Sequence, residues 1–159
     1  MQFVPSLNEE EIRDCKIILR AIGRKRNTYG HALGDFVLPE QRTVQNLIEE
    51  AMTKALREKG YSVVERGFAG YENALPVQAD IGQLWAYTTP GFWVLTFEFE
   101  TVVTVKGDVF PTSKEEQVRG YGRKLAQTGV ESNWIEAIQI GIDDFIENLK
   151  KKLLSAKSE

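Results

Sequence analysis

The sequence has very few of the side chains that build disulfides and metal sites. It contains one cysteine, Cys15, and one histidine, His31. A single cysteine excludes an internal disulfide but leaves the redox compartment open, because many envelope domains also lack disulfides. With no second Cys or His near His31, a zinc site is not expected. We therefore predict neither a metal nor a cofactor.

Long apolar runs are also absent. No stretch approaches the roughly 20 apolar residues that a membrane-spanning helix needs. The N-terminal MQFVPSLNEE lacks the charged start and apolar segment of a secretion signal. Two alternatives stay open: a cytoplasmic protein with Met1 as its native start, or the mature form of an exported protein whose leader is left off.

Neither basic charge nor a catalytic motif stands out. The formal charge is −3, whereas nucleic-acid-binding domains are usually basic. Glu98 and Glu100 are two residues apart, and paired carboxylates can do acid–base chemistry. No nucleophile or partner acid accompanies them, and His31 has no Ser, Cys or Asp at a telling position. We predict a non-enzymatic protein with no catalytic residues.

The strongest positive feature is a long alternating stretch, residues 92–106. Successive strand side chains point to opposite faces, so the alternation predicts one buried and one solvent-exposed face. The exposed side carries Thr96, Glu98, Glu100 and Thr104. The buried side is interrupted only by Thr101 and otherwise comprises Trp93, Leu95, Phe97, Phe99, Val103 and Val105.

The N-terminal half predicts one helix and two short strands. Residues 15–22 are a strand candidate, and residues 24–39, with two glycines and no sustained period, predict a long ordered loop. Residues 43–59 show helical spacing of apolar side chains, with Thr43 as the cap and Gly60 as the stop. Residues 61–65 (YSVVE) are predicted to form a short strand.

The C-terminal half predicts two more strands and a second helix. Residues 76–88 alternate imperfectly, and a bulge at Gly82 would explain the change of phase. The Thr-Pro-Gly at 89–91 predicts a hairpin turn, and residues 115–126 predict a further strand. Asn133 and Glu136 resemble a capping box that opens the last helix. Its apolar face comprises Trp134, Ile138, Gly141, Ile142, Phe145, Leu149 and Leu153.

Together these elements predict an α+β fold with the order β-α-β-β-β-β-α. Two amphipathic helices on one face of a mostly antiparallel sheet make a two-layer sandwich. We predict a flexible N-terminal tether (1–11), a single domain (12–155) and a C-terminal tail (156–159). The far face of the sheet is expected to be polar and open, or used by a partner.

Two groups of residues are candidate binding sites. The first lies in the predicted loop, where three basic residues beside a tyrosine could receive a phosphate, an acidic partner or an anionic lipid head group. The alternative is a solvated loop. This group comprises Arg24, Lys25, Arg26, Asn27 and Tyr29.

The second group, Arg119, Tyr121 and Arg123, alternates on one side of the strand at 115–126. Arginine and tyrosine on one face could bind single-stranded nucleic acid by charge and stacking. The alternative, favoured by the acidic balance of the chain, is pairing with Glu98 and Glu100 across the sheet.

Several segments resemble the YajG-like lipoproteins of bacterial envelopes. They are IGRKRNTYG, LREKGYSVV, VQADIGQLWAY, FWVLTFEFETVVTV and the C-terminal helix, and the resemblance covers about residues 17–153. The resemblance implies a periplasmic domain with no assigned enzymatic activity, anchored to the outer membrane by lipid on an N-terminal cysteine. Cys15 does not fit that role, because Ile12-Arg13-Asp14 precedes it. We expect that Met1 replaces the leader and the lipidated cysteine.

The expected function is therefore a non-enzymatic envelope lipoprotein domain that binds a protein or lipid partner. One alternative is an auxiliary subunit of an envelope lipid or lipopolysaccharide transport system, which is a fold-level analogy. Another is a cytoplasmic nucleic-acid-binding module. A homo-oligomer formed by edge-strand pairing is a further option, with Gly120 and Gly122 as the features that would weaken the edge.

Overall fold

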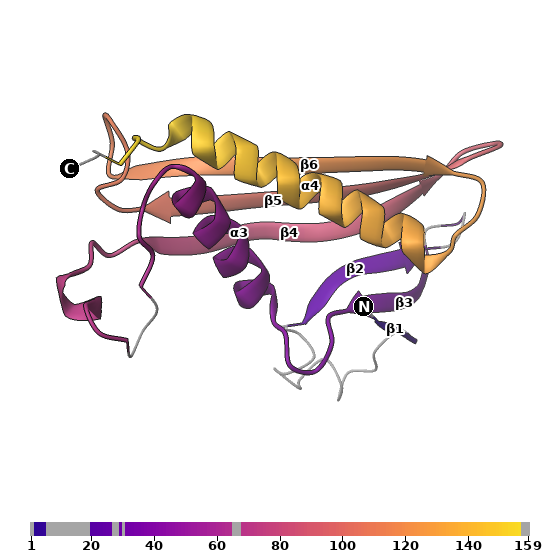
Figure 1. Cartoon of the computed structure of the whole chain (residues 1–159). Helices are drawn as coiled ribbons and strands as arrows, with labels where there is room; N and C mark the ends of the chain where they lie inside the picture. Colours follow the sequence, from indigo (N-terminus) through magenta and orange to yellow (C-terminus); the bar gives the residue numbers. More distant parts are fainter. Residues whose placement is uncertain (1, 6–19, 27–28, 30, 65–67, 157–159) are drawn as a thin grey trace.

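The long alternating stretch forms the middle strand of an antiparallel unit (Figure 1). In the computed structural model, which describes residues 2–5, 20–26, 29, 31–64 and 68–156, this strand is β5 (Leu95–Lys106). It pairs antiparallel with β4 (Gln78–Pro90) on one side and β6 (Glu115–Ala126) on the other. Phe97, Phe99 and Val103 on its inner face are fully buried, as the alternation predicts.

Three shorter strands extend the sheet beyond β4. They are β1 (Gln2–Pro5), β2 (Ala21–Arg26) and β3 (Ala32–Val37), and the full order is β1-β3-β2-β4-β5-β6. β2 runs parallel to β4, while every other pair in this sheet is antiparallel. The sheet is therefore mostly antiparallel, as predicted.

The predicted long loop at 24–39 is wrong, because β2 and β3 occupy most of it. Gly23 and Gly34 interrupt the apolar alternation in these strands and conceal them in the sequence. Gly23 has a packing reason: a Cβ there would lie 2.8 Å from the carbonyl oxygen of Ala86 on β4. A glycine that suggests a loop in the sequence is here a point of close strand approach.

The N-terminal segment is described only in part. Gln2–Pro5, within the predicted tether, form β1 and pair with β3. The rest of that tether, 1 and 6–11, lies outside the described residues. So does most of the predicted strand at 15–22, of which Ala21 and Ile22 open β2.

The helices α3 (Val44–Glu58) and α4 (Glu131–Lys152) cover the same face of the sheet (Figure 1). The predicted start of α3 is confirmed: the Asn46 N–H donates to Thr43 Oγ1 at 3.2 Å, and the Thr43 N–H donates to Asn46 Oδ1 at 3.0 Å. These two bonds satisfy backbone donors at the helix start. Gly60 follows the helix with a φ of 91°, which suits glycine.

The predicted start of α4 is wrong by two residues. The helix begins at Glu131, and its N-cap, Val130, provides no side-chain bond. Asn133 is already helical, and its Nδ2 donates backward to the Thr128 carbonyl at 2.8 Å. A capping residue must be non-helical itself, so the Asn133–Glu136 pattern does not mark the boundary. The predicted apolar face of α4 is buried throughout.

Three glycines let α4 lie against β6 and β5 at very short range. A Cβ on Gly122 would stand 2.0 Å from the Ala137 carbonyl oxygen, and one on Gly120 would stand 2.3 Å from that of Gly141. A Cβ on Gly141 would stand 2.4 Å from Phe99 Cδ1. These distances are far below van der Waals contact, so the glycines set how closely the two layers approach. Gly120 and Gly122 therefore have a packing role in addition to any effect on the edge.

The predicted bulge at Gly82 is confirmed. The register between β4 and β5 shifts between Ile81 and Gln83, and Leu84 and Ala86 then continue the buried face. Thr101, the one polar residue in the buried row of β5, donates its hydroxyl to the Gln83 carbonyl at 3.1 Å. The threonine therefore satisfies a backbone acceptor beside the bulge, which explains why a buried position tolerates it.

Trp93 was predicted to join the buried row of β5, and this is wrong. Its side chain is 80% exposed, in the β4–β5 turn with Phe92, which is 90% exposed. β5 begins only at Leu95, so the alternating pattern in the sequence starts before the strand does, and Trp93 lies outside the strand. The core tryptophan is instead Trp134 of α4, whose ring centroid lies 4.3 Å from that of Phe36 and 5.5 Å from that of Phe97.

The fold class is confirmed as a two-layer α+β sandwich, although the order of elements differs. Among the described residues, three strands precede α3 and three follow it, with a short 3-10 helix, η1 (Tyr71–Asn73), between α3 and β4. The predicted strand at 61–65 is wrong, because 61–64 are irregular; Glu65 lies outside the described residues. Tyr61 and Val63 still pack against the core, so their apolar pattern reflects partial burial without strand pairing.

Candidate functional site

One side of β4, β5 and β6 faces away from α3 and α4 (Figure 1), and the strand residues that alternate with the buried ones, mostly polar or aromatic, belong to this side. We call it the open face. It forms because the residues between the buried ones on each strand project to this side. Its members, which the strand register places in neighbouring rows, are Gln83, Trp85, Tyr87, Thr89, Glu98, Glu100, Val102, Arg119, Tyr121 and Arg123.

The two glutamates at the centre of the open face each accept two hydrogen bonds from neutral groups. Glu100 accepts from Tyr87 Oη at 3.0 Å and from Gln83 Nε2 at 2.8 Å. Glu98 accepts from Tyr121 Oη at 2.7 Å and from Thr89 Oγ1 at 3.3 Å. All four carboxylate oxygens are therefore engaged, and the bonds run diagonally across three strands.

These contacts fix the protonation states of the tyrosines. Burial raises the pKa of Tyr87 to about 12, together with its hydrogen bond to Glu100 and the nearby negative charges. The hydrogen bond to Glu98 raises the pKa of Tyr121. Both phenols are therefore protonated donors near neutral pH, and the carboxylates are held as acceptors. The result is an ordered array of phenol, amide and hydroxyl donors on two carboxylates that spans three strands.

The arginines of the open face do not pair with these glutamates. Arg123 lies opposite Glu98 in the register, yet within the described part of the chain it forms no ion pair or hydrogen bond. Arg119 reaches only Gln117, at 3.4 Å. Of the predicted cross-strand pairs, the structure thus confirms the one made by Tyr121. Arg119 and Arg123 therefore flank Tyr121, which is 44% exposed, with one guanidinium group on each side.

In the other predicted group, in the first part of the sheet, Arg24 is already engaged by an acidic side chain. Arg24 Nε lies 2.6 Å from Asp35 Oδ1, and Asp35 is buried. The hydrogen bond to Asp35 raises the pKa of Arg24, so this guanidinium already has an acidic partner. Tyr29 is 86% exposed in the β2–β3 turn.

The remaining members of that group are only partly described. Lys25 and Arg26 occupy the last two positions of β2, but their side chains, like the whole of Asn27, lie outside what the structure describes. The first part of the predicted basic loop is therefore the end of a strand.

Glu98 and Glu100 do not belong to a cluster of metal-ligating side chains in the part of the chain that the structure describes. In the described residues, no three His, Cys, Asp or Glu side chains gather closely enough to hold a metal ion. A hollow of about 690 Å³ runs along the solvent side of α3 and is lined by polar residues such as Glu49, Thr53 and Arg57. That hollow lies on a different element from Glu98 and Glu100.

Trp85 and Tyr87 belong to the open face, although the sequence left their orientation undecided. The alternation of β4 offered two continuations after Gly82, and only the bulge decides between them. A second feature was missed altogether: the exposed aromatic pair Phe92 and Trp93 at the hairpin turn. The signal for it was the Thr-Pro-Gly turn at 89–91, which places the next residues outside the strands.

Comparison with known proteins adds no relative. No family model matches the chain, and neither does a curated protein or a solved structure. None of the described helices has the length and apolarity to cross a membrane. The resemblance to the YajG-like lipoproteins consequently stays a prediction carried by the segments quoted above.

Proposed function

We propose that this chain is a non-enzymatic binding domain of the bacterial cell envelope that docks a protein partner through the open face. One observation carries the proposal: Arg119 and Arg123 stand without ionic partners, among the described residues, on both sides of exposed Tyr121. Beside them lies the ordered array around Glu98 and Glu100. The partner is expected to present carboxylates to the arginines.

A protein partner fits this surface better than a small molecule or a nucleic acid. Arginine, tyrosine and tryptophan dominate the energetics of protein interfaces, and the open face supplies all three. Small-molecule sites are concave, whereas the hollow described here lies along α3. Glu98 and Glu100 would repel a phosphate backbone that followed Arg119, Tyr121 and Arg123.

The absence of enzymatic activity is part of the same proposal. The paired carboxylates are two residues apart on one strand, and their oxygens are already engaged by neutral donors. His31 is exposed and lies on the other side of β2, next to β3. Catalysis requires a nucleophile or base within reach of a bound substrate, and this arrangement supplies none at the open face.

The test is affinity capture with a charge-removing double substitution, Arg119→Gln with Arg123→Gln. We expect captured partner to fall by about tenfold or more, because interface arginines are frequent hot spots. The matched control is Arg42→Gln with Arg57→Gln, which removes the same charge from the solvent side of α3. Equal capture by both double variants would contradict the proposal.

Two further measurements separate the alternatives. Single-stranded oligonucleotides titrated at two salt concentrations test the nucleic-acid module, since true binding must weaken steeply with salt. Fractionation of cells that express the native gene product tests the periplasmic, outer-membrane assignment. Co-purified lipid in native mass spectrometry would favour the transport-subunit alternative.

A further inference from the structure

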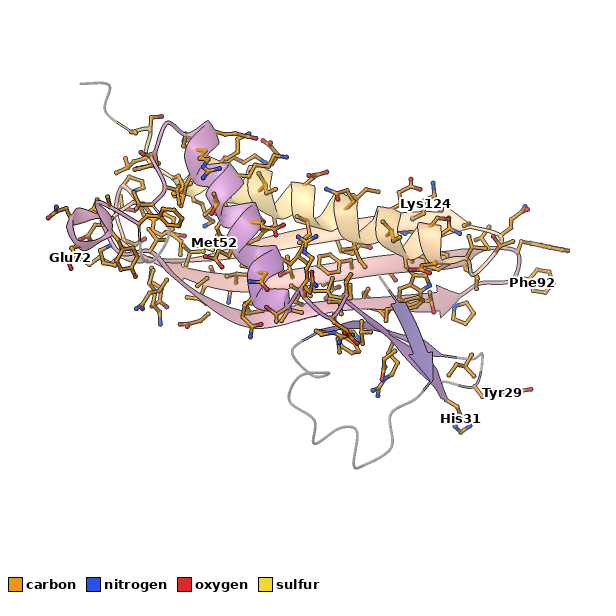
Figure 2. The ribbon with its side chains drawn as sticks, turned by 60° about the horizontal axis from the view of Figure 1, so that its bottom comes forward. Tyr29, His31, Met52, Glu72, Phe92 and Lys124 are labelled. Carbon is orange, nitrogen blue, oxygen red and sulfur yellow. The ribbon has the colours of Figure 1, made fainter. Side chains whose placement is uncertain are left out.

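Two connections lie together at one end of the sheet. The β4–β5 turn and the β6–α4 connection share this end because β5 is antiparallel to both of its neighbours. Figure 1 shows the β4–β5 hairpin as the outermost point of this end, beyond the start of α4. Figure 2 places Phe92 at the tip, with Tyr29 of the β2–β3 turn toward the same end. We call the β4–β5 turn and the β6–α4 connection the aromatic end.

The aromatic end is uncharged. No Asp, Glu, Lys or Arg occurs in residues 81–97, which include most of β4 and the whole turn, or in residues 125–130 before α4. The connections at the opposite end differ: the β5–β6 connection contains Asp108 and Lys114, which pair at 3.3 Å. Over a quarter of the whole chain is charged, so two neighbouring segments of this length without a charge are distinctive.

The aromatic end also exposes large apolar side chains. Phe92 and Trp93 are 90% and 80% exposed, and their rings meet edge to face with centroids 4.8 Å apart. Leu125 and Val130 are each about half exposed nearby along the same end. The Gly91 N–H donates to the Val94 carbonyl at 2.8 Å and closes the turn. The two rings therefore project from a hydrogen-bonded turn.

We propose that the aromatic end inserts into the interfacial region of a lipid bilayer, with Phe92 and Trp93 at the boundary between head groups and acyl chains. Tryptophan is enriched at that level because its ring is apolar and its N–H is polar. The Gly91–Val94 hydrogen bond and the pairing of Pro90 with Leu95 satisfy part of the backbone of the turn internally. This lowers the free-energy cost of moving the turn out of water. The open face extends away from this end along the strands.

A bilayer fits the composition of this end better than a protein or a second copy of the chain. The polar residues of the two segments at this end are uncharged and include Thr88, Thr89, Thr96, Gln127 and Thr128. A protein interface is framed by a polar rim that often includes charges for steering and register, and this end has none within the two segments. Insertion at a head-group level requires no matching pocket and incurs little desolvation cost for such residues.

The experiment is flotation of the full chain with vesicles of phosphatidylcholine alone and of phosphatidylethanolamine mixed with phosphatidylglycerol. We expect the chain to bind both kinds of vesicle. The vesicle-bound fraction should change by less than about twofold between low and high salt, because the two inserted segments carry no charge to screen. Emission from Trp93 should shift to the blue on binding. The shift should survive Trp85→Phe and disappear in Trp93→Phe.

The decisive variant is Phe92→Ser with Trp93→Ser, which should lower the vesicle-bound fraction by about tenfold or more. Its matched control is Phe68→Ser with Tyr71→Ser, which removes two exposed aromatics from the connection before β4 and should bind as the unmodified chain does. Because the rings make no core contact, both variants should keep the melting temperature nearly unchanged.

Three outcomes would overturn the inference: no flotation, equal flotation of both double variants, or flotation restricted to anionic vesicles and lost in salt. If the chain dimerises in the absence of vesicles, and Phe92→Ser with Trp93→Ser makes it monomeric, the aromatic end would instead bind a second copy of the chain. Arg119→Gln with Arg123→Gln should float normally, so failure here and failure of the proposed docking function are distinguishable.

Discussion

The two faces of β5 differ in what holds them, although their residues alternate along one strand. On the inner face, Phe97 and Phe99 are fully buried, and Phe99 lies under Gly141 of α4 at a distance that admits no Cβ. On the outer face, Glu98 and Glu100 are half-buried and held by diagonal hydrogen bonds to neutral donors. The inner face is therefore held by close packing of side chains, and the outer face by the geometry of its hydrogen bonds.

This difference separates stability from binding. Close packing is intolerant of added volume, whereas cross-strand polar pairs on a sheet surface contribute only about 0.2–1 kcal/mol each. Substitutions on the inner face should thus unfold the domain, and substitutions on the outer face should leave a folded protein with altered recognition. The following predictions test that contrast, from the largest expected effect to the smallest.

The largest effect is expected from Gly122→Ala. The new Cβ would collide with the Ala137 carbonyl oxygen and the Gly141 nitrogen, which are both backbone atoms of α4. The helix would have to move off the sheet, so we expect a loss of about 1–3 kcal/mol or more in the free energy of unfolding. Chemical denaturation monitored by circular dichroism measures it.

The matched control is Gly82→Ala at the exposed bulge. There the nearest atom to an added Cβ is the Val102 carbonyl oxygen at 3.5 Å, an ordinary contact. We expect a change of less than about 0.5 kcal/mol, as for surface substitutions away from special features. Equal losses in the two variants would show that the inner face is no more tightly packed than the bulge.

The second prediction concerns the edge of β6 that faces away from β5. Asp144 Oδ2 of α4 accepts from the Tyr121 N–H at 3.0 Å, and Asn148 Nδ2 donates to the Arg119 carbonyl at 3.1 Å. These side chains occupy backbone groups that another strand would need for pairing.

Asp144→Ala with Asn148→Ala should free this edge. We expect a loss of roughly 1–3 kcal/mol in stability and concentration-dependent self-association, measured by sedimentation velocity. Asp143→Ala is the control, because the exposed Asp143 carboxylate contacts Lys54 and Gln139 and no atom of β6. A double variant that stays as monomeric as the control would remove the protective role of α4.

The third prediction concerns the open face and pH. The raised pKa of Tyr87, about 12 in the folded state, compares with about 10 in an unfolded chain. Its contribution to stability is therefore fully present below pH ~10 and is lost as the pH rises through the folded value. Glu100→Gln removes the acceptor charge beside Tyr87, while burial, the larger cause, remains.

We therefore expect Glu100→Gln to lower the pKa of Tyr87 part of the way toward its unfolded value, measured by tyrosinate absorbance. The alkaline loss of stability should become shallower, and stability at neutral pH should change by less than about 1 kcal/mol. Glu49→Gln, on the exposed side of α3, should leave the titration unchanged. An unaltered Tyr87 titration in Glu100→Gln would contradict the hydrogen-bonded array.

Strong local patterns predicted most of the fold. The periodicity of α3, with Thr43 and Gly60 at its ends, the buried row from Phe97 to Val105, and the bulge at Gly82 all correspond to the structure. Predictions failed where the apolar pattern of a segment does not correspond to its strand pairing. YSVVE has strand composition but no partner strand in the part described, and β2 and β3 are strands whose glycines hide them.

The candidate site was predicted in its residues but not in its contacts. The placement of Arg119, Tyr121 and Arg123 on one side of a strand follows from alternation alone. Which of them reaches a glutamate does not follow from the strand register either. Glu98 lies opposite Arg123, yet it accepts a diagonal bond from Tyr121 Oη, and the arginines have no ionic partner among the described residues. Trp93 shows the same limit, because alternation cannot tell where a strand ends and a turn begins.

By itself, the sequence determined the elements with clear periods and the two-layer α+β class, since period and burial are both local consequences of where apolar side chains fall. Only the tertiary structure decided that Gly120, Gly122 and Gly141 set the spacing of the layers, that Arg24 is taken by Asp35, and that Phe92 and Trp93 project at one end. The physical reason is that these features depend on distances between residues far apart in the chain, which no local pattern encodes.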